Sequence, residues 1–81
     1  MCNKKNLLIF GGFGFIGTNI LKYIDSQLSH LYNCIVLDRI AQHPHGVEIS
    51  CISKVYSGDF SDSQLIERIF SENKIDIVIH S

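Results

Sequence analysis

The sequence predicts an α/β fold, a doubly wound parallel sheet with helices on both faces and the strand order 3-2-1-4. Three observations lead to this prediction. Short apolar runs alternate along the chain with segments of helical periodicity. The glycine-rich segment G-G-F-G-F-I-G at residues 11–17 joins the first apolar run to the first helical segment. An acidic residue, Asp38, ends the second apolar run.

The first half of the chain predicts a strand, a helix and a second strand. Residues 6–10 contain the apolar run L-L-I-F, and residues 33–38 contain C-I-V-L before the aspartate. Such continuous runs, and I-D-I-V-I at residues 75–79, fit strands that are covered on both faces. Residues 15–29 predict a helix because apolar side chains recur at helical spacing, at Ile16, Ile20, Leu21, Ile24 and Leu28.

The second half predicts a strand at residues 49–57, a helix at 62–73 and a strand at 76–80. Ser61 followed by Gln64 is a capping box, which predicts the start of this helix. The helix is expected to bury one apolar stripe, formed by Leu65, Ile66, Ile69 and Phe70.

The strand order predicts where a ligand binds. Right-handed crossovers place the second and third strands on one side of the first strand and the fourth strand on the other. The direction in which strands are added to the sheet therefore reverses between the first and fourth strands. Ligands bind at the carboxyl edge beside such a switch point. The glycine-rich turn, His80 and Ser81 are expected to meet there.

The residue types of the turn suit the pyrophosphate of a dinucleotide. Unpaired backbone N–H groups at the amino end of a helix hold this dianion well. Gly11 permits the tight turn, Gly14 lets a phosphate approach the backbone, and Gly17 lets the helix lie close to the sheet. Asp38 can accept the hydroxyl groups of the adenosine ribose, and its charge would repel a 2′-phosphate. A turn with a purely structural role is the alternative.

Composition argues against other binding classes. The 81 residues are 46% hydrophobic and 19% charged with a net charge of −1, which predicts neither a nucleic-acid nor a membrane partner. His43 and His45 flank the only proline without a third ligand in evident reach, so a solvated loop is favoured over a metal site. The cysteines are odd in number and lack metal spacing, which fits reduced thiols in the cytoplasm, at Cys2, Cys34 and Cys51.

Three stretches resemble the start of the extended short-chain dehydrogenases/reductases, the NAD-dependent epimerase/dehydratase family that includes UDP-glucose 4-epimerase. The stretches are G-G-F-G-F-I-G at residues 11–17, L-D-R at 37–39, and G-D-F-S-D at 58–62 followed by D-I-V-I-H at 76–80. The resemblance spans essentially the whole chain. It implies the N-terminal half of a Rossmann domain, with NAD as the cofactor.

The resemblance also implies residues that meet the cofactor. Beside Gly11, Gly14 and Gly17, the backbone at Phe15 and Ile16 would lie next to the pyrophosphate. The Asp59 side chain and the Phe60 backbone would contact the edge of the adenine. Ser81 would approach the cofactor beyond the last strand.

Four residues bear on cofactor choice and fit. Asp38 would bind the adenosine ribose and favour NAD, whereas the neighbouring Arg39 leaves an opening for NADP. Two residues depart from the family pattern. Phe10 stands where the family usually has threonine, and Phe13 where it usually has a small residue. The benzyl group of Phe13 is expected to crowd the cofactor.

The activity implied by the resemblance is that of a cytoplasmic, homodimeric epimerase or dehydratase, which oxidises a hydroxyl of a nucleotide sugar through bound NAD. The family's catalytic Tyr-x-x-x-Lys pair is missing here, since no tyrosine is followed four positions later by lysine. The chain is therefore expected to be an inactive N-terminal piece of a larger enzyme, either cloned or left by proteolysis, whose remaining part binds most of the sugar. The alternative is a protein that binds a dinucleotide without catalysis.

Overall fold

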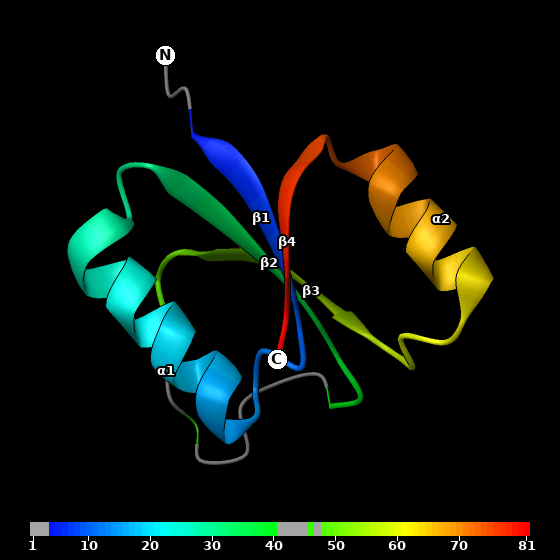
Figure 1. Ribbon diagram of the computed structural model, residues 1–81, viewed down its shortest axis with the longest axis horizontal. Coiled ribbons are helices and arrows are strands. Elements are labelled where there is room, and N and C mark those ends of the chain that lie inside the picture. Colours follow the sequence, from blue (N-terminus) through cyan, green and yellow to red (C-terminus); the bar gives the residue numbers. More distant parts are fainter. Residues whose placement is uncertain (1–3, 41–45, 47) are drawn as a thin grey trace.

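A sheet of four parallel strands lies between two helices in the structure, a computed structural model that describes residues 4–40, 46 and 48–81 (Figure 1). The predicted first helix is present, and its last part widens into a π-helical turn, η1. The elements in chain order are β1 (Lys5–Phe10), α1 (Phe15–Tyr23), η1 (Ile24–Leu28), β2 (Tyr32–Asp38), β3 (Ile52–Ser57), α2 (Ser63–Glu72) and β4 (Ile75–His80).

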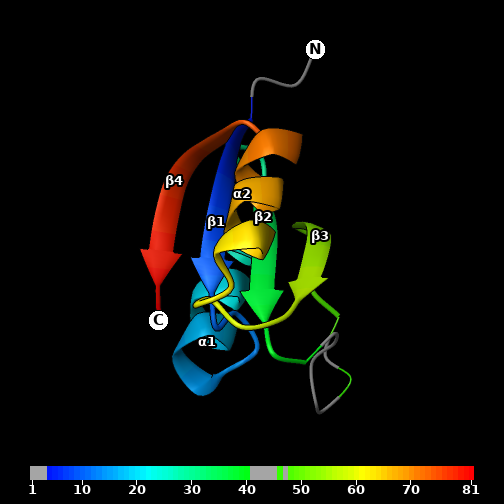
Figure 2. The same cartoon turned by 90° about the vertical axis from the view of Figure 1, so that its right-hand side faces the viewer.

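The strands lie in the order β3-β2-β1-β4, which confirms the predicted topology. Every pairing between them is parallel. Figure 2 shows α2 in front of the sheet and α1 behind it, so the two helices cover opposite faces. The strands all end at one edge, and α1 begins at that edge. Within the described residues, neither helix has the length and apolar character that crossing a membrane requires.

The two central strands are buried because a helix covers each of their faces. Leu7 and Ile9 of β1 pack in one apolar cluster with Leu21 of α1. Leu8 packs in a second cluster, on the opposite face, with Ile69 of α2. Burial of each such side chain contributes about 1.5–3 kcal/mol. The continuous apolar run of β1 thus serves two cores, as the sequence predicts.

The third strand begins at Ile52, so the predicted start at residue 49 is wrong. The preceding residues form a turn in which the Ile52 N–H donates to the Ile49 carbonyl at 3.2 Å. The Cys51 N–H donates to Asp25 Oδ1 at 2.8 Å, which holds this turn against η1. Because Asp25 is distant in sequence, local periodicity carries no sign of this bond.

The second helix begins one residue later than the capping box predicts. Its N-cap is Asp62 and not Ser61, because Asp62 Oδ1 accepts the N–H groups of Gln64 at 3.1 Å and Leu65 at 3.2 Å. A carboxylate at this position satisfies two backbone donors and also suits the positive end of the helix dipole.

Exposure on the outer elements corrects two further expectations. Phe70 is 45% exposed and therefore does not belong to the buried stripe of α2. Val78 of β4 is 47% exposed, so the prediction that this strand is covered on both faces is wrong. The physical reason is that β4 pairs with β1 alone and is an edge strand of the sheet.

The free edge of β4 predicts that the 81-residue chain associates with a second copy of itself. Unpaired backbone groups on an apolar edge favour pairing with another strand, and neither proline nor lysine interrupts Ile75–His80. We expect sedimentation over a concentration series to show a monomer–dimer equilibrium. Val78→Lys should shift that equilibrium to monomer with an unchanged circular-dichroism spectrum. A wild-type chain that stays monomeric at every concentration would contradict the prediction.

Candidate functional site

The turn after β1 depends on glycine at two positions. Gly11 has a φ of +73°, a conformation that residues with a side chain rarely adopt. Its N–H donates to the Leu37 carbonyl at 2.9 Å, and its carbonyl accepts the Gly14 N–H at 3.1 Å. A Cβ at Gly17 would overlap the Gly11 carbonyl oxygen and lie 2.8 Å from Gly12 Cα. The turn and the close approach of α1 therefore both follow from these glycines.

The amino end of α1 is open to an anionic group. Its N-cap, Gly14, has no side chain to accept a hydrogen bond, and the first turn contains no acidic residue. The first N–H groups of a helix have no acceptor within the helix. The start of α2 is different, because the Asp62 carboxylate already accepts two of its N–H groups.

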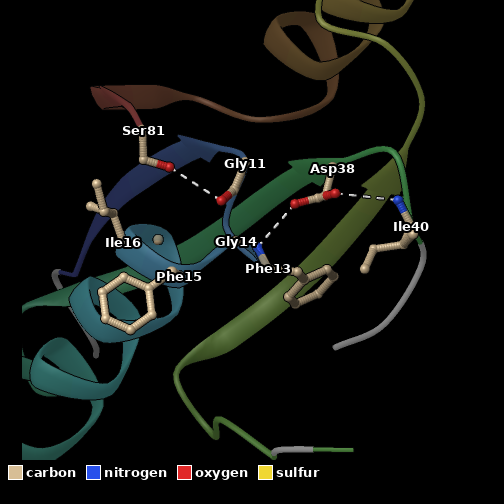
Figure 3. A pocket seen from close by; sticks show the side chains of 9 residues that line it. Gly11, Phe13, Gly14, Phe15, Ile16, Asp38, Ile40 and Ser81 are labelled. Atoms are coloured by element: carbon tan, nitrogen blue, oxygen red, sulfur yellow. Dashed lines mark hydrogen bonds between the residues drawn. The ribbon is translucent and has the colours of Figure 1, made fainter. Parts of the chain in front are cut away.

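Asp38, the last residue of β2, binds backbone on two sides (Figure 3). Its Oδ2 accepts the Phe13 N–H at 3.0 Å, and its Oδ1 accepts the Ile40 N–H at 3.3 Å. A carboxylate offers about four acceptor positions, so Asp38 can also accept from a ligand hydroxyl. The side chain thus has a role in fixing the glycine turn that the sequence did not predict.

Ser81 lies beside the glycine turn, as expected. Its N–H donates to the Phe10 carbonyl at 3.2 Å. Its hydroxyl lies 2.7 Å from the Phe10 carbonyl oxygen and 3.1 Å from that of Gly11. The residue after β4 is therefore bound to the point where β1 enters the turn.

An open cleft of about 520 Å³ lies at this edge of the sheet (Figure 3). Gly11, Gly14 and Gly17, the start of α1, Asp38 and Ser81 line it as expected, whereas His80, also expected here, does not. Phe13 also lines the cleft but is only 8% exposed and packs in the core on the α1 side, which argues against the expected crowding by its ring. Ile40 lines the cleft too and is not among the residues expected from the sequence, although its position two residues after Asp38 could have indicated it.

A smaller hollow of about 170 Å³ is lined by Gly11, Leu37, Asp38, Arg39, Gly58 and Phe60. It adjoins the cleft, because Gly11 and Asp38 line both. Asp59 lines neither, but its Oδ2 lies 3.4 Å from Arg39 Nη2. The Ser61 N–H donates to Asp59 Oδ1 at 2.9 Å. The pKa of the Asp59 carboxyl lies below its ordinary value. The bond from the Ser61 N–H is the largest cause, and the charge of the nearby Arg39 guanidinium is the smallest.

Three aromatic rings pack together beside the hollow, which the sequence did not predict. The ring centroids of Phe10 and Phe60 lie 6.5 Å apart. His80 packs edge-on against both, at 5.6 Å from Phe10 and 5.3 Å from Phe60. Strand register places His80 opposite Phe10. The contact with Phe60 depends on the loop between β3 and α2, which periodicity does not specify.

The other candidate ligands do not form a metal site among the residues that the structure describes. Cys34 and Cys51 are free, buried thiols with their sulfur atoms 3.6 Å apart. Burial raises the pKa of the Cys34 thiol to about 12, which agrees with small apolar roles for both cysteines. Cys2 and the pair His43 and His45 lie outside the described residues.

Comparison with known proteins gives a consistent result. Residues 7–81 match the model of the NAD dependent epimerase/dehydratase family. The chain is 37% identical over 81 residues to a dTDP-D-glucose 4,6-dehydratase of Dictyostelium discoideum, and 34% identical over 82 residues to a UDP-glucose 4-epimerase of Neisseria meningitidis serogroup A. These alignments cover 94% of the chain but only 18% and 23% of the two relatives.

A solved structure supports the same relationship. The UDP-Glc/GlcNAc 4-epimerase of Campylobacter jejuni aligns with a TM-score of 0.71 and 26% identity, covering 95% of this chain and 24% of that one. The chain therefore spans about a fifth to a quarter of the length of the proteins that it matches.

Alanine at two glycines of the turn should have different effects on stability. A Cβ at Gly17 would overlap backbone, whereas one at Gly14 would lie 3.4 Å from the Gly11 carbonyl oxygen, an ordinary contact. We expect Gly17→Ala to lower the free energy of unfolding by about 2 kcal/mol or more. Gly14→Ala should cost less than about 1 kcal/mol, the typical size of an N-cap effect. Urea unfolding followed by circular dichroism measures both; equal losses would show that α1 does not depend on this close approach.

Proposed function

The chain belongs to the NAD dependent epimerase/dehydratase family, and from this premise we propose that its carboxyl sheet edge binds the adenosine and pyrophosphate parts of NAD. The observation that carries the proposal is the open amino end of α1, which the glycine turn brings to the cleft beside Asp38. Such helix ends suit phosphate groups. The 81 residues would then form the N-terminal half of a Rossmann domain.

Backbone groups of the turn would hold the pyrophosphate. Gly11, Gly14, Phe15, Ile16 and Gly17 all line the cleft. Glycine at position 14 leaves room for a phosphate next to the backbone. At the start of α2, by contrast, the Asp62 carboxylate accepts two of the helix N–H groups itself. Phe15 is 85% exposed, and the family resemblance implies that this residue contributes through its backbone.

The adenosine would lie along the end of β2 and over the smaller hollow. Asp38 would accept from the ribose hydroxyls with acceptor positions that its two backbone bonds leave open. The Asp59 carboxylate and the Phe60 backbone would meet the adenine edge, and Ser81 would lie near the cofactor beyond β4. Phe60 lines the smaller hollow, Ser81 lines the cleft, and Asp59 pairs with Arg39 of the smaller hollow, which supports this arrangement.

The parent protein would be a homodimeric enzyme that acts on nucleotide sugars. The relatives are named as an epimerase and a dehydratase, and the chain spans less than a quarter of either. NAD, when bound, would accept a hydride from the carbon that carries a sugar hydroxyl, while that hydroxyl loses its proton. The Tyr-x-x-x-Lys pair and most of the sugar site would come from other parts of the parent, so these 81 residues alone would be inactive. The free, buried Cys34 and Cys51 support a cytoplasmic location.

Cofactor preference tests the role of Asp38. A carboxylate near the adenosine ribose should favour NAD over NADP at least about tenfold, or about 1.4 kcal/mol. Titration of the chain with each cofactor, followed by calorimetry, measures this ratio, and Asp38→Ser should reduce it. Equal affinities for the two cofactors in the wild-type chain would sink this assignment.

The role of the turn backbone is tested at Gly14. Because the phosphate must approach this backbone, we expect Gly14→Val to abolish detectable NAD binding. The circular-dichroism spectrum should remain that of the wild type, since the backbone at Gly14 has an ordinary extended conformation. A folded variant with near-normal affinity would mean that the turn is only structural.

A further inference from the structure

An exposed ion pair stands next to the residue expected to choose the cofactor. Arg39 follows Asp38 directly, and its Nη2 lies 3.4 Å from Asp59 Oδ2. The side chains of the pair are 77% and 47% exposed. Arg39 also lines the smaller hollow beside Asp38. A guanidinium at this place is the kind of group that binds a phosphate with two parallel hydrogen bonds.

Backbone contacts fix the two partners relative to each other. Asp38 lies opposite Ser57 in the β2–β3 register. The Gly58 N–H donates to the Asp38 carbonyl at 2.9 Å, and the Ser57 hydroxyl donates to the Arg39 carbonyl at 3.2 Å. The loop that carries Asp59 is therefore held beside Arg39, and the ion pair forms without any rearrangement of the strand ends.

We infer that Asp59 retains the Arg39 guanidinium and so withholds it from a 2′-phosphate on the adenosine ribose. The inference rests on the proposed NAD-binding function and extends it. Selectivity for NAD would then depend on two carboxylates with separate roles. Asp38 repels the additional phosphate, and Asp59 occupies the nearby cation that would otherwise attract it.

The strength of the pair limits the size of the effect. Exposed ion pairs are weak, so releasing Arg39 should change relative affinity by only about fivefold. Asp59 is also proposed to contact adenine, and its loss would weaken binding of every adenine nucleotide. The ratio of two affinities separates these effects, because the adenine contact is common to both ligands.

The experiment uses two ligands that differ only in the 2′-phosphate and occupy the part of the site that this chain contains. Calorimetry measures the Kd of 5′-AMP and of 2′,5′-ADP for the 81-residue chain. In Asp59→Asn, the ratio should shift about fivefold toward 2′,5′-ADP. Glu67→Gln is the matched control, because it removes one negative charge from an exposed position on α2 that lines neither hollow. Its ratio should equal that of the wild type.

A second substitution identifies the group that binds the phosphate. Arg39→Ala placed in the Asp59→Asn chain should return the ratio to the wild-type value or below it. The shift should also shrink in high salt, because it is electrostatic. An unchanged ratio in Asp59→Asn, or a shift that persists without Arg39, overturns the inference while NAD binding stands. A wild-type chain that binds neither 5′-AMP nor NAD overturns the proposed function and the inference together.

Discussion

The close approach of α1 to the end of β1 is the constraint on which the site depends. A Cβ at Gly17 would overlap the Gly11 carbonyl oxygen. Because Gly17 has no Cβ, α1 can lie against this carbonyl and start directly at the sheet edge. That position exposes the first N–H groups of α1 to the cleft. It also brings the Phe13 N–H within 3.0 Å of the Asp38 carboxylate. A larger residue at position 17 would move the helix outward and separate these groups.

Asp38 links this geometry to the charge of the site. Two backbone N–H groups hold its carboxylate in place. The open helix end beside it attracts an anion, whereas the carboxylate opposes a second one. In the proposed function this combination lets one sheet edge accept a pyrophosphate and still reject a phosphate on the neighbouring ribose. The same side chain therefore stabilises the turn and restricts what the turn can bind.

The smaller hollow is organised by contacts of unequal strength. Aromatic pairs such as those among Phe10, Phe60 and His80 contribute about 0.5–1.5 kcal/mol each. The exposed pair of Arg39 and Asp59 contributes about 0–1 kcal/mol. The aromatic cluster thus stabilises the loop after β3 more than the ion pair does, in addition to the backbone bond from Gly58 to Asp38. The main effect of the ion pair is to hold the positive charge of Arg39 next to Asp59.

The element order, the strand topology and most of the cleft follow from the sequence alone. Strand and helix periods, glycine spacing and the acid at the end of a strand are local patterns, and topology follows from the handedness of crossovers. The tertiary structure decided the start of β3, the burial of Phe13 and the meeting of His80 with Phe60. It also paired Asp59 with Arg39, 20 positions away. These features arise from contacts between residues distant in the chain, whose geometry no local pattern encodes.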